Sequence, residues 1–498
     1  MDPQIVLDLH SFYPEIALTL TLLAVIIVDL ALPRIKKSAT FLVTALGLLA
    51  AFICTLPLVH DPQGTLFYGM IAIDPLAVFF KLFLILTSFL VLLIAPGSRE
   101  LSKDHIGEFY TLLLGVTLGM LLLASATDML MLFLSLEMVS LSSYIMVGYL
   151  SHQRESNEAS LKYILFGAVS TGSMLYGITL LFGMTGSTKM TQIRDMLAQG
   201  TAGGDNTLML LVATVLILAG FGFKTAAVPF HFWCPDVYAG APTPVTAFLS
   251  VAPKAAGFAA LMRFFFTGFS KTAGAGPWTA LPAINWTVFL LMISVVTMTL
   301  GNLAALRQDN MKRMLAYSSI AHAGYILMGT VALSEQGVQS VLIYLITYLF
   351  MNLGAFLIVI EIHNRIGSFN VKGYSGMWHR SPFLTIAMTI FMLSLMGIPP
   401  FAGFFGKLYV FGAAVNHNLA WFAVVGALNS VIAVYYYARV IKTMIIDADA
   451  EGAEVARIRL PWTTHVLLWI LLIPTAGLML VWDRVQQLTL DSMKIFFG

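Results

Sequence analysis

Four charged residues stand inside long apolar stretches of the sequence, where an ionised side chain is costly. They are Glu137, Lys224, Lys254 and Lys407. A charge at the centre of a membrane helix costs roughly 2.5–3.5 kcal/mol. Four uncompensated charges would therefore cost on the order of 10 kcal/mol, which is comparable to the stability of a whole domain. We expect these side chains to face the protein interior, to pair with one another, or to contact water.

Such a set of side chains could carry protons. Burial lowers the pKa of a lysine and a neighbouring carboxylate raises it, so a lysine under both influences can load and release a proton near neutral pH. Glu137 in MLFLSLEMVS and Lys224 in AGFGFKTAAV are candidates for such a pair. Alternatively, Glu137 is only hydrogen-bonded to Ser135 or Ser140, and Lys224 reaches the membrane interface from a helix that ends near Pro229.

Lys254 and Lys407 lie beside helix-breaking residues. Lys254 is near the middle of the apolar stretch 242–267, too deep to reach the interface easily. Pro253, the residue before it, removes one backbone hydrogen bond and opens a polar gap at that level. Lys407 follows GIPPFAGF, in which prolines and glycines interrupt a helix and free backbone carbonyls. Both lysines are predicted to transfer protons, and a purely structural role is the alternative.

Two histidines and one charged pair could extend this path. His231 and His322 carry imidazoles, which titrate near neutral pH, although each could equally be a hydrogen-bonded structural residue. Glu158 and Lys162 are four residues apart near the start of another apolar stretch. Such a pair stabilises a helix, and the same pair could also serve proton uptake.

The composition identifies the elements that must position these residues. The 498-residue chain is 59% hydrophobic and only 10% charged, whereas soluble proteins carry about 25% charged residues. A membrane helix needs roughly 20 apolar residues. The sequence therefore predicts an all-α polytopic membrane protein in a lipid bilayer, with spans at 14–32, 38–58, 74–95, 107–125, 127–149, 160–184, 208–228, 242–267, 283–306, 313–333, 338–362, 382–416, 418–442 and 462–482. This excludes a soluble enzyme and a secreted disulfide scaffold, and with a net charge of +2 we expect no nucleic-acid partner.

The order of the spans suggests an internal repeat. Spans four to eight and nine to thirteen form two sets of five, and an odd number inverts the second set in the membrane. Span seven (208–228) and span twelve (382–416) are each predicted to be broken by proline or glycine and to carry a lysine, the pattern of an ion path near the bilayer midplane. The predicted segments are an N-terminal three-helix segment (1–106), a first repeat (107–270), an inverted second repeat (271–445) and a C-terminal loop and helix (446–498).

The loops between spans predict the orientation. Lysine and arginine are enriched in the loops that lie inside when both termini are placed outside, as the positive-inside rule requires. Two further basic residues lie closer to span ends. Lys81 is expected to reach the interface or a partner, and Arg263 to reach the outer surface with its long side chain.

The sequence lacks the motifs of a resident cofactor. Its two cysteines, Cys54 and Cys234, form no CxxC motif and no cluster with histidine. No GxGxxG follows a strand, and no Walker A motif is present. We therefore expect no metal, nicotinamide, flavin or nucleotide site in this chain. The energy for any transport must then come from partners or from another ion gradient.

Three segments resemble a known family. These are FKTAAVPFHFWCPDVYAGAPTPVTAFLSVAPKAAGFAAL (223–261), YSSIAHAGY (317–325) and GIPPFAGFFGK (397–407). They are similar to the N-type antiporter-like membrane subunits of bacterial respiratory complex I, the proton-pumping NADH:quinone oxidoreductase. Lysine at 254 fits the N or M type better than the L type, and Lys407 argues against the M type, which usually has Glu there. The segment departs from the family at Ala239, where Glu is common.

The resemblance implies a fold, a mechanism and an assembly. It implies inverted five-helix repeats with broken helices 7 and 12, a Glu137–Lys224 pair, a connecting Lys254 and a terminal Lys407. It also implies that NADH, FMN, iron–sulfur clusters and quinone are bound by partner subunits, that the chain contacts M-type and small membrane subunits, and that it lies in the bacterial inner membrane. In that membrane the loop charges predict that both termini are periplasmic. Two other functions stay open, namely a monovalent cation/proton antiporter subunit and a non-pumping structural subunit.

Overall fold

The structure is a computed structural model, and it describes residues 3–31, 37–60, 64–101, 105–199, 207–272, 278–282, 284–447 and 457–494. In this part of the chain, twelve helices are long and apolar enough to cross a membrane. Two further predicted spans complete the set of fourteen. One is α13 (Met311–Val331), which carries Lys312, Arg313 and His322. The other is the pair of shorter helices α16 (Pro382–Met396) and α17 (Ala402–Asn416). The predicted polytopic all-α fold is confirmed.

The N-terminal segment consists of helices joined by a small hairpin. Asp74 begins the last of these helices as its N-cap, because its carboxylate accepts a hydrogen bond from Ala77 N at 2.7 Å. The two short strands pair antiparallel, with Gly64 opposite Ile73. The elements are α1 (Pro3–Ser11), α2 (Tyr13–Ala31), α3 (Lys37–Thr55), η1 (Leu56–Val59), β1 (Gly64–Leu66), η2 (Phe67–Gly69), β2 (Ile71–Ile73), α4 (Pro75–Ile94) and η3 (Ala95–Gly97).

The central segment contains the first predicted repeat. Its longest helix, the third of the set, has 32 residues, and the fourth is interrupted. The elements are α5 (Ile106–Ser125), α6 (Met129–Val147), α7 (Arg154–Thr185), α8 (Met190–Ala198), α9 (Thr207–Thr225), α10 (Trp233–Gly240), α11 (Thr243–Arg263), η5 (Phe264–Gly268) and the antiparallel strands β3 (Ser270–Thr272) and β4 (Trp278–Ala280).

The next segment shows the same order of features. Its third helix also has 32 residues, and its fourth is again interrupted. Besides α13, α16 and α17, the elements are α12 (Trp286–Ala305), α14 (Glu335–Ile366), η6 (Val371–Tyr374), α15 (Met377–Arg380) and α18 (Ala420–Ile445), followed by α19 (Trp462–Gly477), η7 (Leu478–Val481) and α20 (Trp482–Ser492).

The two interruptions have visible backbone causes. Between α9 and α10 the chain turns through Ala226, whose φ is 58°, in the left-handed region. Gly397, with φ of 85°, ends α16 before the Pro399-Pro400 pair, which cannot continue the helix. Each break leaves a lysine beside it, because Lys224 lies in the last turn of α9 and Lys407 lies in α17.

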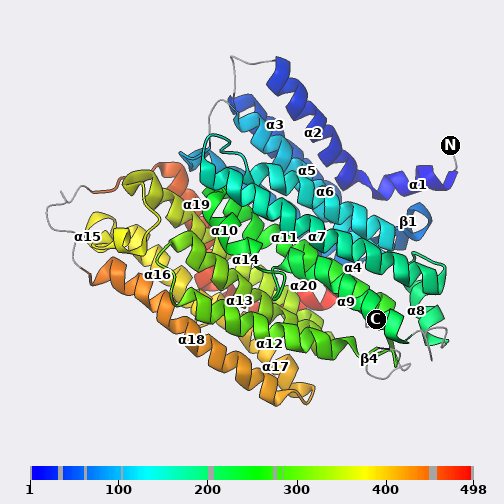
Figure 1. The fold of residues 1–498 in the computed structure, drawn as a ribbon. Coiled ribbons are helices and arrows are strands. Elements are labelled where there is room, and N and C mark those ends of the chain that lie inside the picture. The colour runs from blue at the N-terminus through cyan, green and yellow to red at the C-terminus, as the bar shows by residue number, and fades with distance from the viewer. Residues whose placement is uncertain are drawn as a thin grey trace.

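Helix α11 forms the centre of the molecule. All of its residues from Thr243 to Arg263 are buried, and it packs against α4, α5, α9 and α14. In Figure 1 the blue helices α2 and α3 lie at one edge of the bundle and the orange helix α18 at the opposite edge, with α10, α11 and α14 between them. Lys254 is therefore held in a helix that is buried along its whole length, where its side chain cannot reach the surface.

Candidate functional site

Lys224 is buried at the end of α9 and faces α6. Its Nζ donates a hydrogen bond to Ser140 Oγ at 3.1 Å. Helix α11 approaches closely here, since a Cβ on Gly257 would stand 3.2 Å from Lys224 Cγ. The small residue at 257 therefore makes room for the lysine stem.

Glu137 lies on α6 one helical turn before Ser140 and acts on Lys224 through space. These two described residues form no direct ion pair, and in this structure the predicted pair of Glu137 and Lys224 acts at a distance. Ser140, one helical turn after Glu137 on α6, accepts the hydrogen bond from Lys224 Nζ instead. Glu137 is half-buried, so its carboxylate is within electrostatic reach of the lysine without contacting it.

Lys254 is bound to α13. Its Nζ donates to Ser319 Oγ at 2.6 Å and lies 5.7 Å from the centre of the Tyr238 ring. The neighbouring Pro253 lies inside α11 without ending it. The depth that the sequence predicted for Lys254 is confirmed, since only 4% of the residue is exposed. Its hydrogen-bond partner is a neutral hydroxyl, so no carboxylate fixes its charge by contact.

Lys407 uses the break between α16 and α17. Its Nζ donates to the carbonyl oxygen of Met396 at 2.7 Å, and this carbonyl is at the end of α16. The ring centre of Tyr325 lies 5.0 Å from the same nitrogen. Gly397 allows this arrangement, because a Cβ there would approach Lys407 Cδ to 2.7 Å. A carbonyl freed by the helix break, as the sequence indicated, is thus the acceptor for this lysine.

His322 lies between Lys254 and Lys407 and interacts electrostatically with both. Its Nδ1 is 2.6 Å from Tyr344 Oη, and its Nε2 is 3.1 Å from Tyr437 Oη. One ring nitrogen donates and the other accepts in a neutral imidazole. We call Lys254, His322 and Lys407, with the side chains and carbonyl that bond to them, the polar route; among the described residues no direct hydrogen bond joins His322 to either lysine.

The polar route continues into α12 and α18. Tyr437 Oη is hydrogen-bonded to Ser318 Oγ. Asn302 Nδ2 donates to Tyr325 Oη at 3.0 Å, and Tyr436 Oη donates to Asn302 Oδ1 at 3.0 Å. The sequence analysis missed these residues. A hydroxyl or amide in an apolar helix is a weak signal, because it can bond to its own helix backbone.

His231 is separate from this route. It is buried between α9 and α10, and its Nδ1 has no hydrogen-bond partner among the described residues. Its ring lies 4.4 Å from that of Phe232. The structure thus places His231 beside the break, as predicted from sequence, and leaves it without a direct bond to any of the three lysines.

Glu158 and Lys162 belong to a chain of ion pairs at one end of the bundle. Lys162 Nζ is 2.8 Å from Glu158 Oε1 and 2.7 Å from Asp236 Oδ2. The other oxygen of Asp236 is 2.6 Å from Arg313 Nη1. Asp236 on α10 therefore links α7 to α13, a connection between distant segments that spacing in the sequence could not reveal.

Two fully buried ion pairs were also missed. Lys81 Nζ lies 2.7 Å from Glu15 Oε1, and both side chains are completely buried, so Lys81 meets a partner within the chain. Arg263 is not extended to the surface, and that expectation is wrong. Its guanidinium makes two hydrogen bonds to Asp74, at 2.6 and 2.9 Å, and a third to the carbonyl of Ala124. A buried carboxylate at the start of α4 holds it inside.

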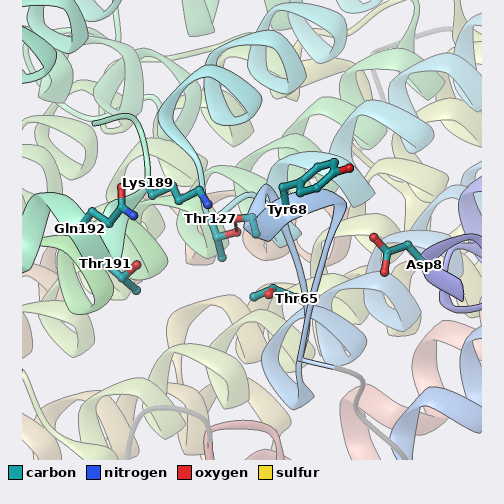
Figure 2. A pocket seen from close by; sticks show the side chains of 8 residues that line it. Asp8, Thr65, Tyr68, Thr127, Lys189, Thr191 and Gln192 are labelled. Carbon is teal, nitrogen blue, oxygen red and sulfur yellow. Dashed lines mark hydrogen bonds between the residues drawn. The ribbon is translucent and has the colours of Figure 1, made fainter. Parts of the chain in front are cut away.

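Two cavities in the described part of the chain lie away from Lys224, Lys254 and Lys407. One, of about 480 Å³, lies between the N-terminal hairpin and the start of α8, and Figure 2 shows Asp8, Tyr68 and Lys189 along it. Another, of about 960 Å³, includes Glu361, whose Oε1 accepts a hydrogen bond from Thr464 at 2.8 Å. Within the described part of the chain, no cluster of three or more His, Cys, Asp or Glu side chains could hold a metal ion. The candidate chemistry therefore belongs to the buried lysine route.

Comparison with known proteins identifies the family. Residues 126–433 match the family model described as NADH:quinone oxidoreductase/Mrp antiporter, TM. The chain is 43% identical to NADH-quinone oxidoreductase subunit N of Anaeromyxobacter sp. (strain Fw109-5), over 98% of this chain and 97% of that protein. The chain belongs to the subunit N family of NADH-quinone oxidoreductases. It is also 42% identical to subunit N 2 of Chloroherpeton thalassium, over 97% of this chain and 94% of that protein.

A solved structure agrees with this family. The chain is similar to a chain of respiratory complex I from Thermus thermophilus, with a TM-score of 0.77 and 31% sequence identity, covering 95% of this chain and 98% of that one. The predicted N-type family and the multi-span antiporter-like fold are both confirmed. Subunit N proteins are membrane subunits of a redox-driven translocase, which gives the buried lysine route its functional setting.

Proposed function

We propose that this chain translocates protons in the membrane arm of a NADH:quinone oxidoreductase, driven by redox chemistry in other subunits. The observation that carries the proposal is the burial of Lys254, His322 and Lys407 in one region of the bundle. Each has its own hydrogen bonds to neighbouring helices, Lys254 to α13, His322 to α14 and α18, and Lys407 to α16. Buried ionisable residues in membrane helices mark ion paths. Lys254 donates to a hydroxyl and Lys407 donates to a backbone carbonyl. Both acceptors are neutral, so each lysine can keep its hydrogen bond as an amine or as an ammonium.

The proton path begins at the end of the bundle where Glu158, Lys162 and Asp236 form ion pairs. From there a proton loads the amine of Lys224, whose charge is stabilised at a distance by Glu137. Movement of Glu137 away from Lys224 weakens that stabilisation, and the charge passes on to Lys254. His231, which lies beside the break in helix 7, is a candidate relay at this step.

The second half of the path uses the polar route. Lys254 passes a proton through the Ser319 side of α13 to His322, which can accept on one nitrogen while it gives up a proton from the other. Tyr344 and Tyr437 hold the imidazole in place. Lys407 is the terminal carrier, and the proton leaves to the outside.

The assembly follows the family. We assign residues 107–270 and 271–445 to two inverted repeats, with 1–106 and 446–498 outside them, supported by the matching 32-residue helices and matching breaks. Both termini face the periplasm of a bacterial inner membrane. NADH, FMN, iron–sulfur clusters and quinone are bound by partner subunits, and the neighbours in the membrane arm are M-type and small membrane subunits.

Substitution of the lysines in the intact complex tests this function. Lys224→Ala and Lys407→Ala should lower proton pumping and quinone-coupled turnover. Oxidation of NADH with an artificial acceptor should be unchanged, because that reaction does not need the membrane arm. Lys271→Ala, on a surface strand, is the control and should pump normally. Normal pumping by an assembled Lys224→Ala complex would exclude the proposed route.

A cation/proton antiporter function is the second candidate, since the description of the matching family model also names Mrp antiporters. That function would appear as sodium- or potassium-dependent proton exchange in vesicles without NADH. The remaining alternative is a structural subunit. In that case the lysine variants would lower assembly of the complex and leave pumping per assembled complex unchanged.

A further inference from the structure

Polar side chains follow the contact between α11 and α14. We call this contact the polar seam and define it by Thr243, Ser250 and Lys254 on α11 and Tyr348 and Asn352 on α14. Residues spaced by four, seven or eleven lie on one face of a helix, so each helix presents its members to one side. Asn352 Nδ2 donates to Ser250 Oγ at 2.5 Å and joins the two helices near the middle of the seam.

One end of the seam meets three titratable side chains. Glu100 Oε2 accepts a hydrogen bond from the backbone N of Thr243 at 2.7 Å, and Glu100 Oε1 is 3.9 Å from Lys312 Nζ. His363 interacts electrostatically with both of these groups and stacks on Phe369 at a ring distance of 3.8 Å. This end lies at the C-terminal end of α14, which is the cytoplasmic side in the proposed orientation.

The seam contains polar atoms that lack partners. Thr243 Oγ1 and Asn352 Oδ1 are buried and have no hydrogen-bond partner among the described residues. The hydroxyls of Tyr238 and Tyr348 lie beside Ser319 without a well-aligned hydrogen bond. An unsatisfied buried polar atom costs about 1–3 kcal/mol, and proteins commonly satisfy such atoms with ordered water. Thr243 Oγ1 and Asn352 Oδ1 are therefore the atoms of the seam that lack a partner and could accept a hydrogen bond from water.

Among the described residues, no hydrogen bond joins Lys254 to Lys224, the lysine that is loaded first in the proposed path. Lys224 bonds to Ser140 on α6 and Lys254 bonds to Ser319 on α13, and no direct hydrogen bond joins the two lysines among the described residues. The seam, in contrast, ends at Lys254 itself. From Thr243 to Ser250 is about 10 Å along the helix, a distance that takes about four successive hydrogen bonds of ~2.8 Å to bridge.

We infer that ordered water in the polar seam delivers protons from Glu100, Lys312 and His363 directly to Lys254, in parallel with the route through Lys224. This inference rests on the proposed proton-translocating function. The neutral amine of Lys254 accepts a proton from the nearest water and becomes an ammonium. That water regains a proton from the next one along the seam, and the last is reprotonated from the cytoplasm at the three titratable groups.

Water positions test the inference without measuring transport. A cryo-electron microscopy map of the intact complex, at a resolution that shows ordered water, should contain water within about 3.2 Å of Asn352 Oδ1 and of Thr243 Oγ1. Further water should lie between these two levels. A dry seam in such a map would overturn the inference and would leave the proposed proton pumping untouched.

Two substitutions at one position separate water transfer from a structural role. Asn352→Leu fills the seam with an apolar side chain and should lower pumping to the share that the route through Lys224 carries. Asn352→Ser leaves room for water and should retain more pumping than Asn352→Leu. A purely structural role predicts no such order, because serine leaves the larger void. Thr385→Val on α16 is the matched control and should pump normally, because the Thr385 hydroxyl donates to the Ser381 carbonyl of its own helix turn and to no other described residue.

The outcomes are distinguishable from those for the main proposal. Normal pumping by Asn352→Leu, with Lys407→Ala still impaired, would contradict proton delivery through the polar seam and leave the proposed function standing. Normal pumping by both would overturn the proposed function as well. If Asn352→Leu fails to assemble, Thr243→Val removes the other unpaired oxygen, and normal pumping by that variant would equally contradict the inference.

Discussion

The buried ion pair between Arg263 and Asp74 gives the sharpest stability prediction. Asp74 caps α4 through Ala77 N and binds the Arg263 guanidinium with both oxygens. Asp74→Asn keeps a side chain that caps helices well but removes the negative charge. Arg263, whose side chain is 1% exposed, would then keep the carbonyl of Ala124 as its acceptor but no counter-charge.

The expected loss of stability in Asp74→Asn follows from the burial of Arg263. Removing one partner of a buried ion pair costs about 3–5 kcal/mol, because the other charge stays uncompensated. Asp128→Asn is the matched control, since Asp128 also caps a helix, accepts from Leu130 N at 2.9 Å, and has no ion pair among the described residues. A capping position that keeps its hydrogen bond should lose no more than about 1 kcal/mol.

The assay is retention of this subunit in the purified complex during incubation at a fixed temperature. Each 1.4 kcal/mol changes a rate about tenfold if the lost stability appears in the barrier to dissociation. The difference of about 2–4 kcal/mol between the two variants should therefore shorten the half-life of the assembled complex by about thirty- to seven-hundredfold for Asp74→Asn relative to Asp128→Asn. Equal half-lives of the two variants would refute the reasoning that the buried charge pair dominates at this position.

Two other substitutions have defined expectations. Glu15→Gln should lower the stability of the N-terminal segment by about 3–5 kcal/mol, because Lys81 loses its only ion-pair partner in the described residues. The double variant Glu15→Gln/Lys81→Met removes the unpaired charge and should recover most of this stability. The measurement is retention of the subunit in the complex on a native gel. Gly397→Ala should impair coupled turnover far more than Gly186→Ala. Both glycines have positive φ, but only the Cβ at 397 would collide with a side chain, that of Lys407, and turnover similar in the two variants would contradict this account.

Much of the fold could be predicted because membrane helices are recognised in a sequence by the length and apolar composition of their spans. The breaks beside Lys224 and Lys407 followed from proline and glycine, whose backbone restrictions are local. The depth of Lys254 followed from its distance to the span ends. These features depend on residues close together in the sequence, so a single sequence contains the information.

The contacts across helices could not be predicted in the same way. Asp236 joins Lys162 to Arg313, and Glu15 joins Lys81, only because the packing brings distant segments together. The distance between Glu137 and Lys224 could not be predicted for a related reason. Glu137 and Ser140 lie one helical turn apart on the same side of α6. The periodicity of the sequence does not show which of the two lies next to Lys224 where the helices cross.

The central claim is that the buried lysines carry the protons. The most direct test is the number of protons moved per NADH oxidised in vesicles that contain the purified complex with Lys254→Ala. The account predicts a lower ratio than in the unaltered complex, with NADH oxidation by an artificial acceptor unchanged. An assembled Lys254→Ala complex that moves the full number of protons per NADH would contradict it.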